Sequence, residues 1–435
     1  MLEQLNTWVW GSGLLVLLLG TGLFLSIRTH FFQIFGIHTI FRQTFGRLFR
    51  REDGAEQWKT CSAALAAAMG TGNIVGVAAA ISAGGAGAVF WMWVSAFLGM
   101  MLTYAENVLA VRYRSETEKW AVGALAYLKN GLRSPILAGL YAVFCVLASF
   151  GMGNMTQSSA AAAALEQGCH IPPIWTGVGV TILLLGTVLG GMRTIGTVTQ
   201  FLMPILSGGY LLAAAIVLVQ HAGQLGTAFA TIFHAAWHPA AVGGGTLGTV
   251  LSAGLRHGVF SNEAGLGSAP IAAAAAQTKE PVRQGLVSMT GTFIDTIIIC
   301  SITGIAIVVT GAYDMGLEGV AVTTKAFQLG LPFPNGVASF ILMLCLVFFA
   351  FTTILGWDYY GERCLEYLTN GSKVSVQIYR WLYILCVFIG PYMTVAAVWN
   401  IADIFNALMA FPNLIALLVL NGVVVKETKE FHAKH

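Results

Sequence analysis

Charged side chains are scarce in this sequence. Asp, Glu, Lys and Arg make up 9% of the 435 residues, whereas soluble domains carry about 25%. Hydrophobic residues make up 57% of the chain, and the mean hydropathy is +0.76. The chain therefore lacks the polar surface of a soluble enzyme or binding module. Its composition predicts a protein that crosses the lipid bilayer several times.

Three further features are missing. The seven cysteines show neither a disulfide framework nor the spacing of a metal site, because all but Cys169 fall within or at the ends of apolar segments. The first eight residues contain no Lys or Arg and no small-residue cleavage site follows, so the first apolar run is expected to stay as a helix. The net charge of +3 belongs to loops beside lipid headgroups, and no nucleic-acid partner is expected.

Apolar runs of about 20 residues, the length of a membrane-spanning helix, recur along the chain. We predict an all-α polytopic fold with eleven transmembrane helices, at 9–26, 58–81, 88–112, 136–165, 174–190, 198–220, 247–275, 286–311, 336–366, 378–397 and 401–425. The loops at 221–241 and 314–333 are long enough to hold helices in the membrane interface.

Basic residues are concentrated in alternate loops. All but two of the 22 Lys and Arg residues fall on one side under the eleven-helix assignment, the exceptions being Lys325 and Arg256. Because loops rich in Lys and Arg stay in the cytoplasm, this pattern predicts an extracytoplasmic N-terminus and a cytoplasmic C-terminus. The compact loops fit a multi-pass protein of a prokaryotic inner membrane.

Two of the predicted helices are interrupted, at 70–73 and within 257–270. Backbone freed from helical bonding cannot face lipid, since each unpaired group in hydrocarbon costs several kcal/mol, so both breaks should line a cavity. Each break begins a set of five helices, at 58–220 and 247–425, and the second set enters the membrane in the opposite sense because five is odd. We therefore predict a single transport domain, a 5+5 inverted repeat with one extra N-terminal helix at 9–26.

The ends of the broken helices differ in polarity. In the predicted orientation the first break offers carbonyls on its cytoplasmic side and free N–H groups after Thr71 and Gly72. The second break offers carbonyls near Gly258, Val259 and Phe260. Carbonyls suit Na⁺ or an ammonium group, and N–H groups suit a carboxylate. Together the two breaks predict a pocket for a zwitterion, an α-amino acid.

Two further helices carry polar side chains to the same region. Thr352 and Thr353 are adjacent hydroxyls that can complete a sodium shell, and Trp357 lies one turn beyond Thr353, where it caps a small pocket. Asn154 and Gln157 stand at i and i+3 and are expected to reach one ligand. Small and hydroxyl residues also serve helix packing in membranes, so the prediction depends on the conjunction of two breaks with facing polar groups.

Several long motifs resemble the alanine or glycine:cation symporter family. They are GTGNIVGVA at 70–78, GGAGAVFWMWVSAFLGM at 84–100, VFSNEAGLGSAPIAAAAA at 259–276, SMTGTFIDTI at 288–297 and LGWDYYGE at 355–362. The resemblance covers 8–428 and implies the ten-helix fold of the leucine transporter, Na⁺ coupling and a small neutral substrate such as alanine or glycine. One stretch, Ala121 to Leu125, departs from the Gly-Gly-Pro-Met often found in the family and borders the cytoplasmic side.

The resemblance also implies which residues bind substrate and ion. The candidate substrate site consists of Thr71, Gly72, Asn73, Gln157, Phe260, Ser261, Thr353 and Trp357. By similarity to the leucine transporter, the candidate sodium site consists of the carbonyls of Ala66, Met69 and Phe349 with the hydroxyls of Thr352 and Thr353. Thr353 belongs to both sets, and we favour the ion with substrate nearby.

Four ionisable residues fall inside apolar helices, namely Glu106, Glu263, Asp295 and Arg256. A charge at mid-bilayer costs at least ~2.5 kcal/mol and normally has a partner, so we expect Arg256 to pair with Glu263 or Asp295. A proton relay or a gate latch is the alternative role. His257 is expected to pack with a hydrogen bond beside the second break. Asp403 is expected at a helix start or facing a loop.

The residues also bear on several other functions. GTGNIVG has the wrong spacing for a dinucleotide loop and lies in no βαβ unit. An intramembrane hydrolase would need Ser261 and His257 to share a face, which a break between them does not ensure. A passive channel and a proton-coupled amino-acid transporter stay as alternatives. The favoured function is a symporter, not an enzyme, that couples inward Na⁺ movement to uptake of alanine or glycine by alternating access, and the sequence indicates no oligomeric state.

Overall fold

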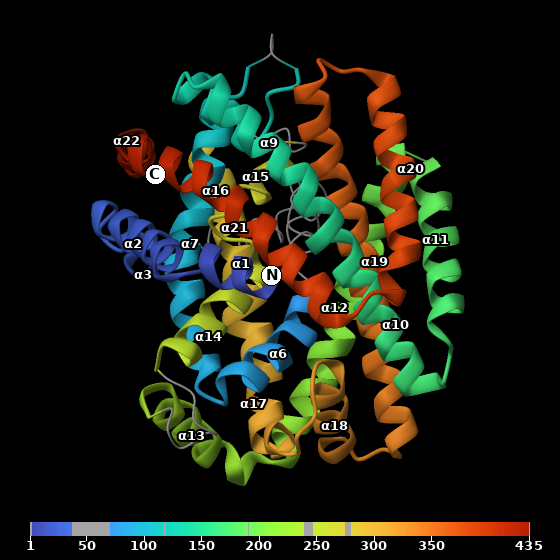
Figure 1. Cartoon of the computed structure of the whole chain (residues 1–435). Coiled ribbons are helices and arrows are strands. Elements are labelled where there is room, and N and C mark those ends of the chain that lie inside the picture. Colours follow the sequence, from blue (N-terminus) through green and yellow to red (C-terminus); the bar gives the residue numbers. More distant parts are fainter. Residues whose placement is uncertain are drawn as a thin grey trace.

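The computed structural model of the chain describes residues 2–36, 70–115, 119–189, 191–238, 247–274 and 280–434. Within these ranges every regular element is a helix (Figure 1). Seven helical runs of the described residues are long and apolar enough to cross a membrane, and the pair Pro204–Gln220 and Ala222–Trp237, bent by 73°, would make an eighth. The number eleven stays a prediction, since part of the first broken helix lies outside the described residues.

The described α-helices are, in chain order, α1 (Leu2–Val9), α2 (Ser12–Arg28), α3 (Phe32–Phe35), α6 (Val75–Gly84), α7 (Ala88–Arg112), α8 (Ala124–Ala126), α9 (Pro135–Phe150), α10 (Thr156–Cys169), α11 (Pro173–Leu189), α12 (Gly191–Gln220), α13 (Leu225–Trp237), α14 (Leu247–Asn262), α15 (Ala269–Ala273), α16 (Pro281–Thr292), α17 (Ser301–Val309), α18 (Val320–Gly330), α19 (Asn335–Leu368), α20 (Lys373–Ile389), α21 (Val395–Val419) and α22 (Asn421–Lys434). The helix predicted at 88–112 is found with those bounds as α7. Helices α13 and α18 lie in the two loops for which interfacial helices are predicted.

Two π-helical segments join helices into longer runs. Segment η3 (Gly151–Met155) connects α9 to α10, and η6 (Phe293–Cys300) connects α16 to α17. A π-turn carries one more residue than an α-turn and often occurs at a functional site. Both segments lie in the middle of their runs. All residues of η3 are buried, and half of those of η6 are.

The long helices form an upright bundle (Figure 1). Helix α7 packs against α14 and α16 on one side of the bundle, and α19 packs against α9, α10 and α20 on the other. The short helix α6 lies against α14 in the middle. Helices α13 and α18 cover one end of the bundle (Figure 1). This arrangement places the two interrupted segments between the two sides.

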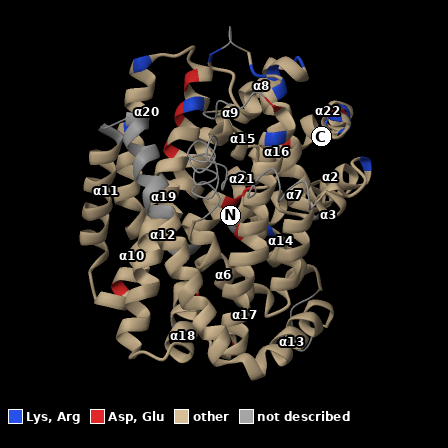
Figure 2. Cartoon of the chain, turned by 180° about the vertical axis from the view of Figure 1, so that it is seen from behind, with Lys and Arg blue, Asp and Glu red and all other residues tan. Residues whose placement is uncertain are grey.

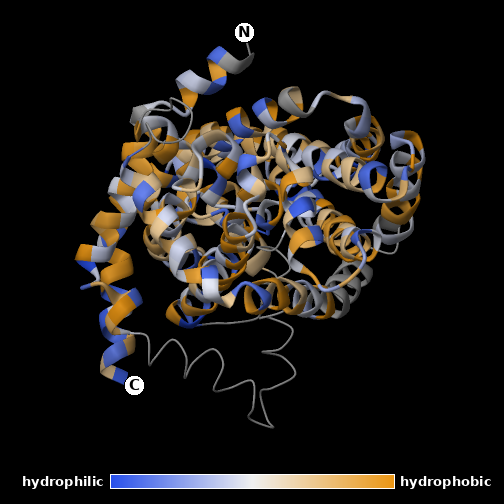
Figure 3. Cartoon of the chain, turned by 90° about the horizontal axis from the view of Figure 1, so that it is seen from below, coloured by the Kyte–Doolittle hydropathy of each residue, from blue (hydrophilic) through white to orange (hydrophobic). Residues whose placement is uncertain are grey.

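The outer faces of the bundle are apolar. Ile136, Val219 and Val374 are 76%, 75% and 69% exposed, respectively. Figure 3 shows hydrophobic residues on the outer helices. Large apolar surfaces of this kind mark contact with a membrane or a partner, and here they fit lipid.

Charged residues are distributed unevenly along the bundle. Figure 2 shows the Lys and Arg residues mostly at the end opposite α13 and α18, where α20 begins and α22 lies. The alternation of basic loops in the sequence therefore corresponds to one end of the folded bundle. Which side of the membrane this end faces stays a prediction.

Candidate substrate and sodium site

The first break is a short 3₁₀ turn, η1 (Thr71–Asn73), that leads into α6. The Asn73 side-chain oxygen accepts a hydrogen bond from the Gly70 N–H (N···O 3.0 Å), and the Asn73 N–H donates back to the Gly70 carbonyl (3.3 Å). No described residue accepts a hydrogen bond from the backbone N–H of Thr71 or Gly72. Two N–H groups at the start of a helical segment suit a carboxylate, as the sequence predicts.

Glycine is required where η1 meets its neighbours. A Cβ atom on Gly72 would lie 2.9 Å from the Cα atom of Ser261 on α14. A Cβ atom on Gly70 would lie 2.6 Å from the hydroxyl oxygen of Thr353 on α19. The first break therefore touches both walls of the site, and three residues predicted from distant parts of the sequence meet there.

The second break lies in the later part of the predicted range 257–270. Helix α14 continues through Asn262, the chain leaves the helix at Glu263, and α15 begins at Ala269. Glu263 has a left-handed φ of 56°, and Gly265 and Gly267 have φ values of 87° and 75°. Left-handed backbone costs a residue with a side chain about 1–3 kcal/mol, so surrounding contacts must hold Glu263 in place.

Two buried carboxylates hold the second break. Glu263 accepts hydrogen bonds from the Ser268 hydroxyl (2.6 Å) and from the indole N–H of Trp357 (2.8 Å). Glu106 of α7 accepts a hydrogen bond from the Gly267 N–H (3.0 Å). These bonds replace helical ones, and they attach the interrupted segment to α7 and α19.

The second break releases one of the predicted carbonyl groups. The Val259 carbonyl still accepts the Glu263 N–H (2.8 Å), as in a helix. The Ala264 N–H, which would bond the Phe260 carbonyl in a continuous helix, donates instead to Asn262 Oδ1 (3.0 Å). The acceptor that this break frees is therefore the carbonyl of Phe260, and Val259 does not contribute as predicted.

Asp295 of η6 connects the two breaks. Its carboxylate accepts hydrogen bonds from the side-chain amide of Asn73 and from the Ser261 hydroxyl (2.8 Å). Thr296 donates to the same carboxylate (2.7 Å). Asp295 is fully buried and forms no ion pair with a described Lys or Arg. A single carboxylate thus joins Asn73 of the first break to Ser261 next to the second.

Gln157 reaches the first break as predicted, but Asn154 does not join it. The Thr71 hydroxyl donates to Gln157 Oε1 (2.7 Å), and Gln157 Nε2 donates to the Met152 carbonyl (2.9 Å). Asn154 donates to the Tyr383 carbonyl of α20 (2.7 Å). The wider turn of η3 changes the angle between residues three apart, so the two amides face different helices.

Three oxygen atoms of the candidate sodium site gather on α19. The hydroxyls of Thr352 and Thr353 both donate to the Phe349 carbonyl, each at 3.0 Å, a common bond of threonine within a helix. Hard cations prefer oxygen ligands, so this group fits Na⁺. The other two predicted ligands, Ala66 and Met69, lie outside the described residues.

Arg256 pairs with Asp403 of α21, and not with Glu263 or Asp295 as predicted. Asp403 lies inside α21, so its predicted place at a helix start or a loop is wrong. The Trp10 indole donates to the Asp403 carbonyl (2.9 Å), and its ring lies 5.8 Å from the Arg256 guanidinium carbon. The prediction failed because Arg256 and Asp403 are 147 residues apart, and their contact depends on tertiary packing.

His257 and Ser261 have different surroundings. Helix α14 is continuous through both residues, so the break that the sequence predicts between them is not found. The Ser261 hydroxyl donates to Asp295, whereas the His257 ring packs edge-on against Trp399 at 5.5 Å. The expected hydrogen bond of His257 is not found at Nδ1, which has no partner among the described residues. Phe260 also packs on Trp399, at 4.5 Å between ring centroids.

The sequence identified the buried carboxylates but not the residues that bind them. Besides Trp357, the main omission is Asn413 of α21, which donates to Glu106 (2.6 Å) and to the Gly265 carbonyl (2.8 Å). An asparagine inside an apolar helix is itself a signal, because polar side chains within the membrane need partners. Which partner it finds could not be read from its position in the chain.

Known proteins share both the sequence and the fold. A sequence model of the sodium:alanine symporter family matches residues 1–435. The chain belongs to this family. The sodium/alanine symporter AgcS of Methanococcus maripaludis is 43% identical over 99% of this chain and 97% of that protein. The amino-acid carrier protein AlsT of Bacillus subtilis is 34% identical over 96% and 89%, respectively. The protein is therefore a cation-coupled amino-acid symporter and not an enzyme.

Solved structures show the same fold at much lower sequence identity. A Na⁺-coupled sialic acid symporter superimposes on this member of the family with a TM-score of 0.58 at 15% identity, over 96% of this chain and 86% of the other. A transporter of the nucleobase-cation-symport-1 family gives a TM-score of 0.52 at 14% identity, over 86% and 92%. This likeness confirms the predicted leucine-transporter-like fold.

Proposed function

We propose that the protein couples inward movement of Na⁺ to the uptake of alanine or glycine by alternating access. The observation that carries the proposal is the meeting of the two breaks. The N–H groups of Thr71 and Gly72 lie beside the turn of α14 that releases the Phe260 carbonyl, and a Cβ atom on Gly72 would lie 3.4 Å from the Phe260 ring. A donor end and an acceptor end this close suit the carboxylate and ammonium of one amino acid.

In the proposed complex the substrate carboxylate meets the N–H groups of Thr71 and Gly72. The ammonium group meets the Phe260 carbonyl and the amide oxygen of Gln157, which already accepts the Thr71 hydroxyl. Trp357 limits the side chain of the substrate. Its side chain is 1% exposed and its indole N–H is bound by Glu263, which supports a fixed position for the ring. In this proposal the ring leaves room for little beyond a methyl group.

Na⁺ enters this scheme as a second transported substrate. It would bind between the first broken helix and α19, at the Phe349 carbonyl and the Thr352 and Thr353 hydroxyls together with the carbonyls of Ala66 and Met69. Because Thr353 lies against Gly70, an ion at this point orders the turn that carries the N–H groups for the carboxylate. Each ligand then stabilises the conformation that the other binds, which is the physical content of coupling.

We place the basic end of the bundle in the cytoplasm, with the N-terminus outside and the protein in an inner membrane. The gathering of Lys and Arg at one end supports this orientation (Figure 2). In this orientation the two five-helix sets, 58–220 and 247–425, form the inverted repeat whose rocking exposes the site to each side in turn.

A second candidate is coupling to protons. It is favoured by Glu106, Glu263 and Asp295, three buried carboxylates that form no ion pair with a described Lys or Arg. A charge buried within the membrane is costly, and binding of a proton would remove it. We favour Na⁺ coupling, because the chain belongs to the sodium:alanine symporter family and Thr353 of the candidate sodium site lies against Gly70 of the first break.

Uptake into liposomes containing the purified protein tests these alternatives. Radiolabelled alanine and glycine would be measured with an inward Na⁺ gradient, with an inward proton gradient in choline, and with choline alone. We expect accumulation above the external concentration in the first condition only. Accumulation driven by protons in choline would favour the second candidate, and equilibration without accumulation would indicate a channel.

A further inference from the structure

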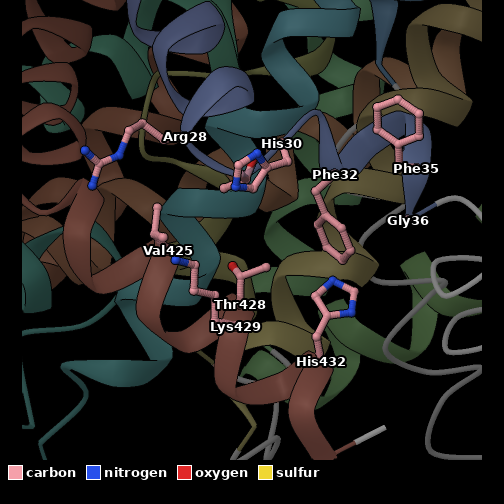
Figure 4. Close-up of a pocket in the computed structure, with 10 residues that line it drawn as sticks. Arg28, His30, Phe32, Phe35, Gly36, Val425, Thr428, Lys429 and His432 are labelled. Atoms are coloured by element: carbon pink, nitrogen blue, oxygen red, sulfur yellow. The ribbon is translucent and has the colours of Figure 1, made fainter.

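A cavity lies where the end of α2 and the start of α3 face α22, well away from the candidate substrate site (Figure 4). Its volume is about 210 Å³. One wall comes from residues 28–36 and the other from the second half of α22. Helix α22 lies toward the basic end of the bundle, and α2 and α3 lie next to it, nearer the middle of the bundle and beside α7 (Figures 1 and 2).

Basic side chains line this cavity. Arg28 and Lys429 contribute two positive charges, and His30 and His432 contribute imidazole rings (Figure 4). Neither Arg28 nor Lys429 forms an ion pair within the described part of the chain. Arg28 rests against the Phe24 ring, 5.9 Å from its centroid, which leaves its N–H groups available.

The acidic neighbours of Lys429 on α22 have other partners. Glu427 pairs with Arg112 at 2.9 Å, and Glu430 lies 3.8 Å from Lys426. No described Asp or Glu lines the cavity. Its positive charge is therefore left without a counter-ion from the described protein.

The cavity is held open by contacts behind it. Val424, Thr428 and Phe431 form the buried face of α22, and the Thr428 hydroxyl bonds Tyr104 of α7 at 2.7 Å. On the opposite wall Phe32 is 4% exposed and meets the His432 ring edge-on, with centroids 5.0 Å apart. Both walls of the cavity are therefore in place before a ligand binds.

Exposed apolar side chains accompany the cavity. Phe35, which lines it, is 81% exposed, and Ile27 and Ile34, which are close to the lining residues in the chain, are 55% and 46% exposed. Apolar surface and basic residues therefore occur in the same segment. A free anion in water would use the charges alone, whereas a phospholipid would use the charges and these apolar side chains together.

We propose that this cavity binds the phosphate headgroup of an anionic phospholipid, with the acyl chains lying along Ile27, Ile34 and Phe35. Basic pockets at the cytoplasmic ends of membrane helices attract such headgroups, and each Lys or Arg near the surface contributes about fivefold in affinity. The bound lipid would link α2 to α22 and fix the C-terminal helix against α7. This site does not depend on the proposed transport mechanism, but it rests on the cytoplasmic orientation proposed above for the basic end.

Native mass spectrometry of the purified protein tests the proposal, with phosphatidylglycerol or phosphatidylcholine added in detergent. The test variant is Arg28→Gln/Lys429→Gln, and the control is Lys426→Gln/Lys434→Gln, which removes two charges from the same end of the molecule without touching the cavity. We expect the wild type and the control to retain phosphatidylglycerol in preference to phosphatidylcholine. The test variant should lose most of this preference, about 25-fold for two charges.

Three results would overturn the proposal. Equal retention of the two lipids by the wild type would show that no headgroup is recognised. Equal losses in the test and control variants would show attraction to surface charge in general. Displacement of phosphatidylglycerol by millimolar inorganic phosphate would identify a site for a free anion. The single variant Lys429→Gln, with a loss of about fivefold, gives the same comparison if the double variant does not fold.

Discussion

The first break shares one carboxylate, Asp295, with α14 and is otherwise held by neutral groups, whereas the second is held by two carboxylates of its own, Glu106 and Glu263. At the first, an Asn73 amide closes the turn and the Thr71 hydroxyl donates to Gln157. At the second, Glu263 and Glu106 accept the bonds that fix the chain. Hydrogen bonds to charged groups are worth about 1.5–3 kcal/mol, roughly twice the value of neutral ones. We infer that the first break rearranges more readily when ligands bind and that the second forms a firmer wall.

Asp295 binds Asn73 of the first break and Ser261 next to the second. Its replacement should therefore have the largest effect. Asp295→Asn keeps the shape of the side chain but removes the charge that binds Asn73 and Ser261. We expect initial rates of alanine uptake to fall about 10- to 100-fold, as loss of charged hydrogen bonds predicts. Asp314→Asn, at an exposed position in the 3₁₀ turn Ala312–Asp314, is the control. Near-normal uptake by Asp295→Asn would show that the two breaks do not depend on a shared carboxylate.

The close approach of the first break to α14 gives the next largest effect. In Gly72→Ala the new methyl group would lie 2.9 Å from Ser261 Cα, so backbone must shift, at a cost of about 1–3 kcal/mol. We expect alanine uptake to fall about tenfold or more. The matched variant Gly76→Ala places its methyl group 3.9 Å from the Phe260 ring, an ordinary contact, and should transport normally. Equal rates in the two variants would contradict the packing described for η1.

Gln157→Leu tests the neutral hydrogen bond between Thr71 and Gln157 at the first break. It removes the acceptor of the Thr71 hydroxyl, a loss of about 1 kcal/mol, so the KM for alanine should rise about fivefold. The sodium dependence should change less, because the oxygen atoms of α19 are untouched. Asn154→Leu, whose partner is Tyr383, serves as the control on the same helical run. A larger change for sodium than for alanine would mean that the two sites have been exchanged.

Trp357 should affect selectivity more than rate. A smaller residue such as Ala opens space beside the substrate methyl group and should admit larger side chains. Trp357→Phe keeps most of the ring but loses the indole N–H that binds Glu263. Inhibition of labelled alanine uptake by serine, valine, leucine and methionine would measure the preference. If Trp357→Ala shows the same preference as the wild type, Trp357 does not limit substrate size.

Local sequence patterns were sufficient to predict where helices are interrupted. Glycine and asparagine within an apolar run weaken the helix. Backbone groups without helical hydrogen bonds cannot face lipid, so such a segment must lie in the protein interior. Local patterns do not define the end of α14, because residues 257–262 are compatible with a helix. The chain leaves the helix only at Glu263, whose left-handed backbone depends on its hydrogen bonds to Ser268 and Trp357.

Contacts between distant helices could not be predicted in the same way. Arg256 is predicted to pair with Glu263 or Asp295, and its pairing with Asp403 instead follows from how α14 and α21 pack. The separation of Asn154 from Gln157 follows from the π-helical turn η3, which has no clear signal in the sequence. The role of Asp295 likewise requires both breaks and η6 to be in place before it can be recognised.

Binding of labelled alanine to the purified protein, measured across a range of Na⁺ concentrations with choline as the replacement, tests the central claim most directly. If one enclosed site holds both ligands, Na⁺ must raise the affinity for alanine, and alanine must raise the affinity for Na⁺ by the same factor. Thr353→Val should weaken this mutual effect. Alanine binding that is equally tight in Na⁺ and in choline would contradict the account.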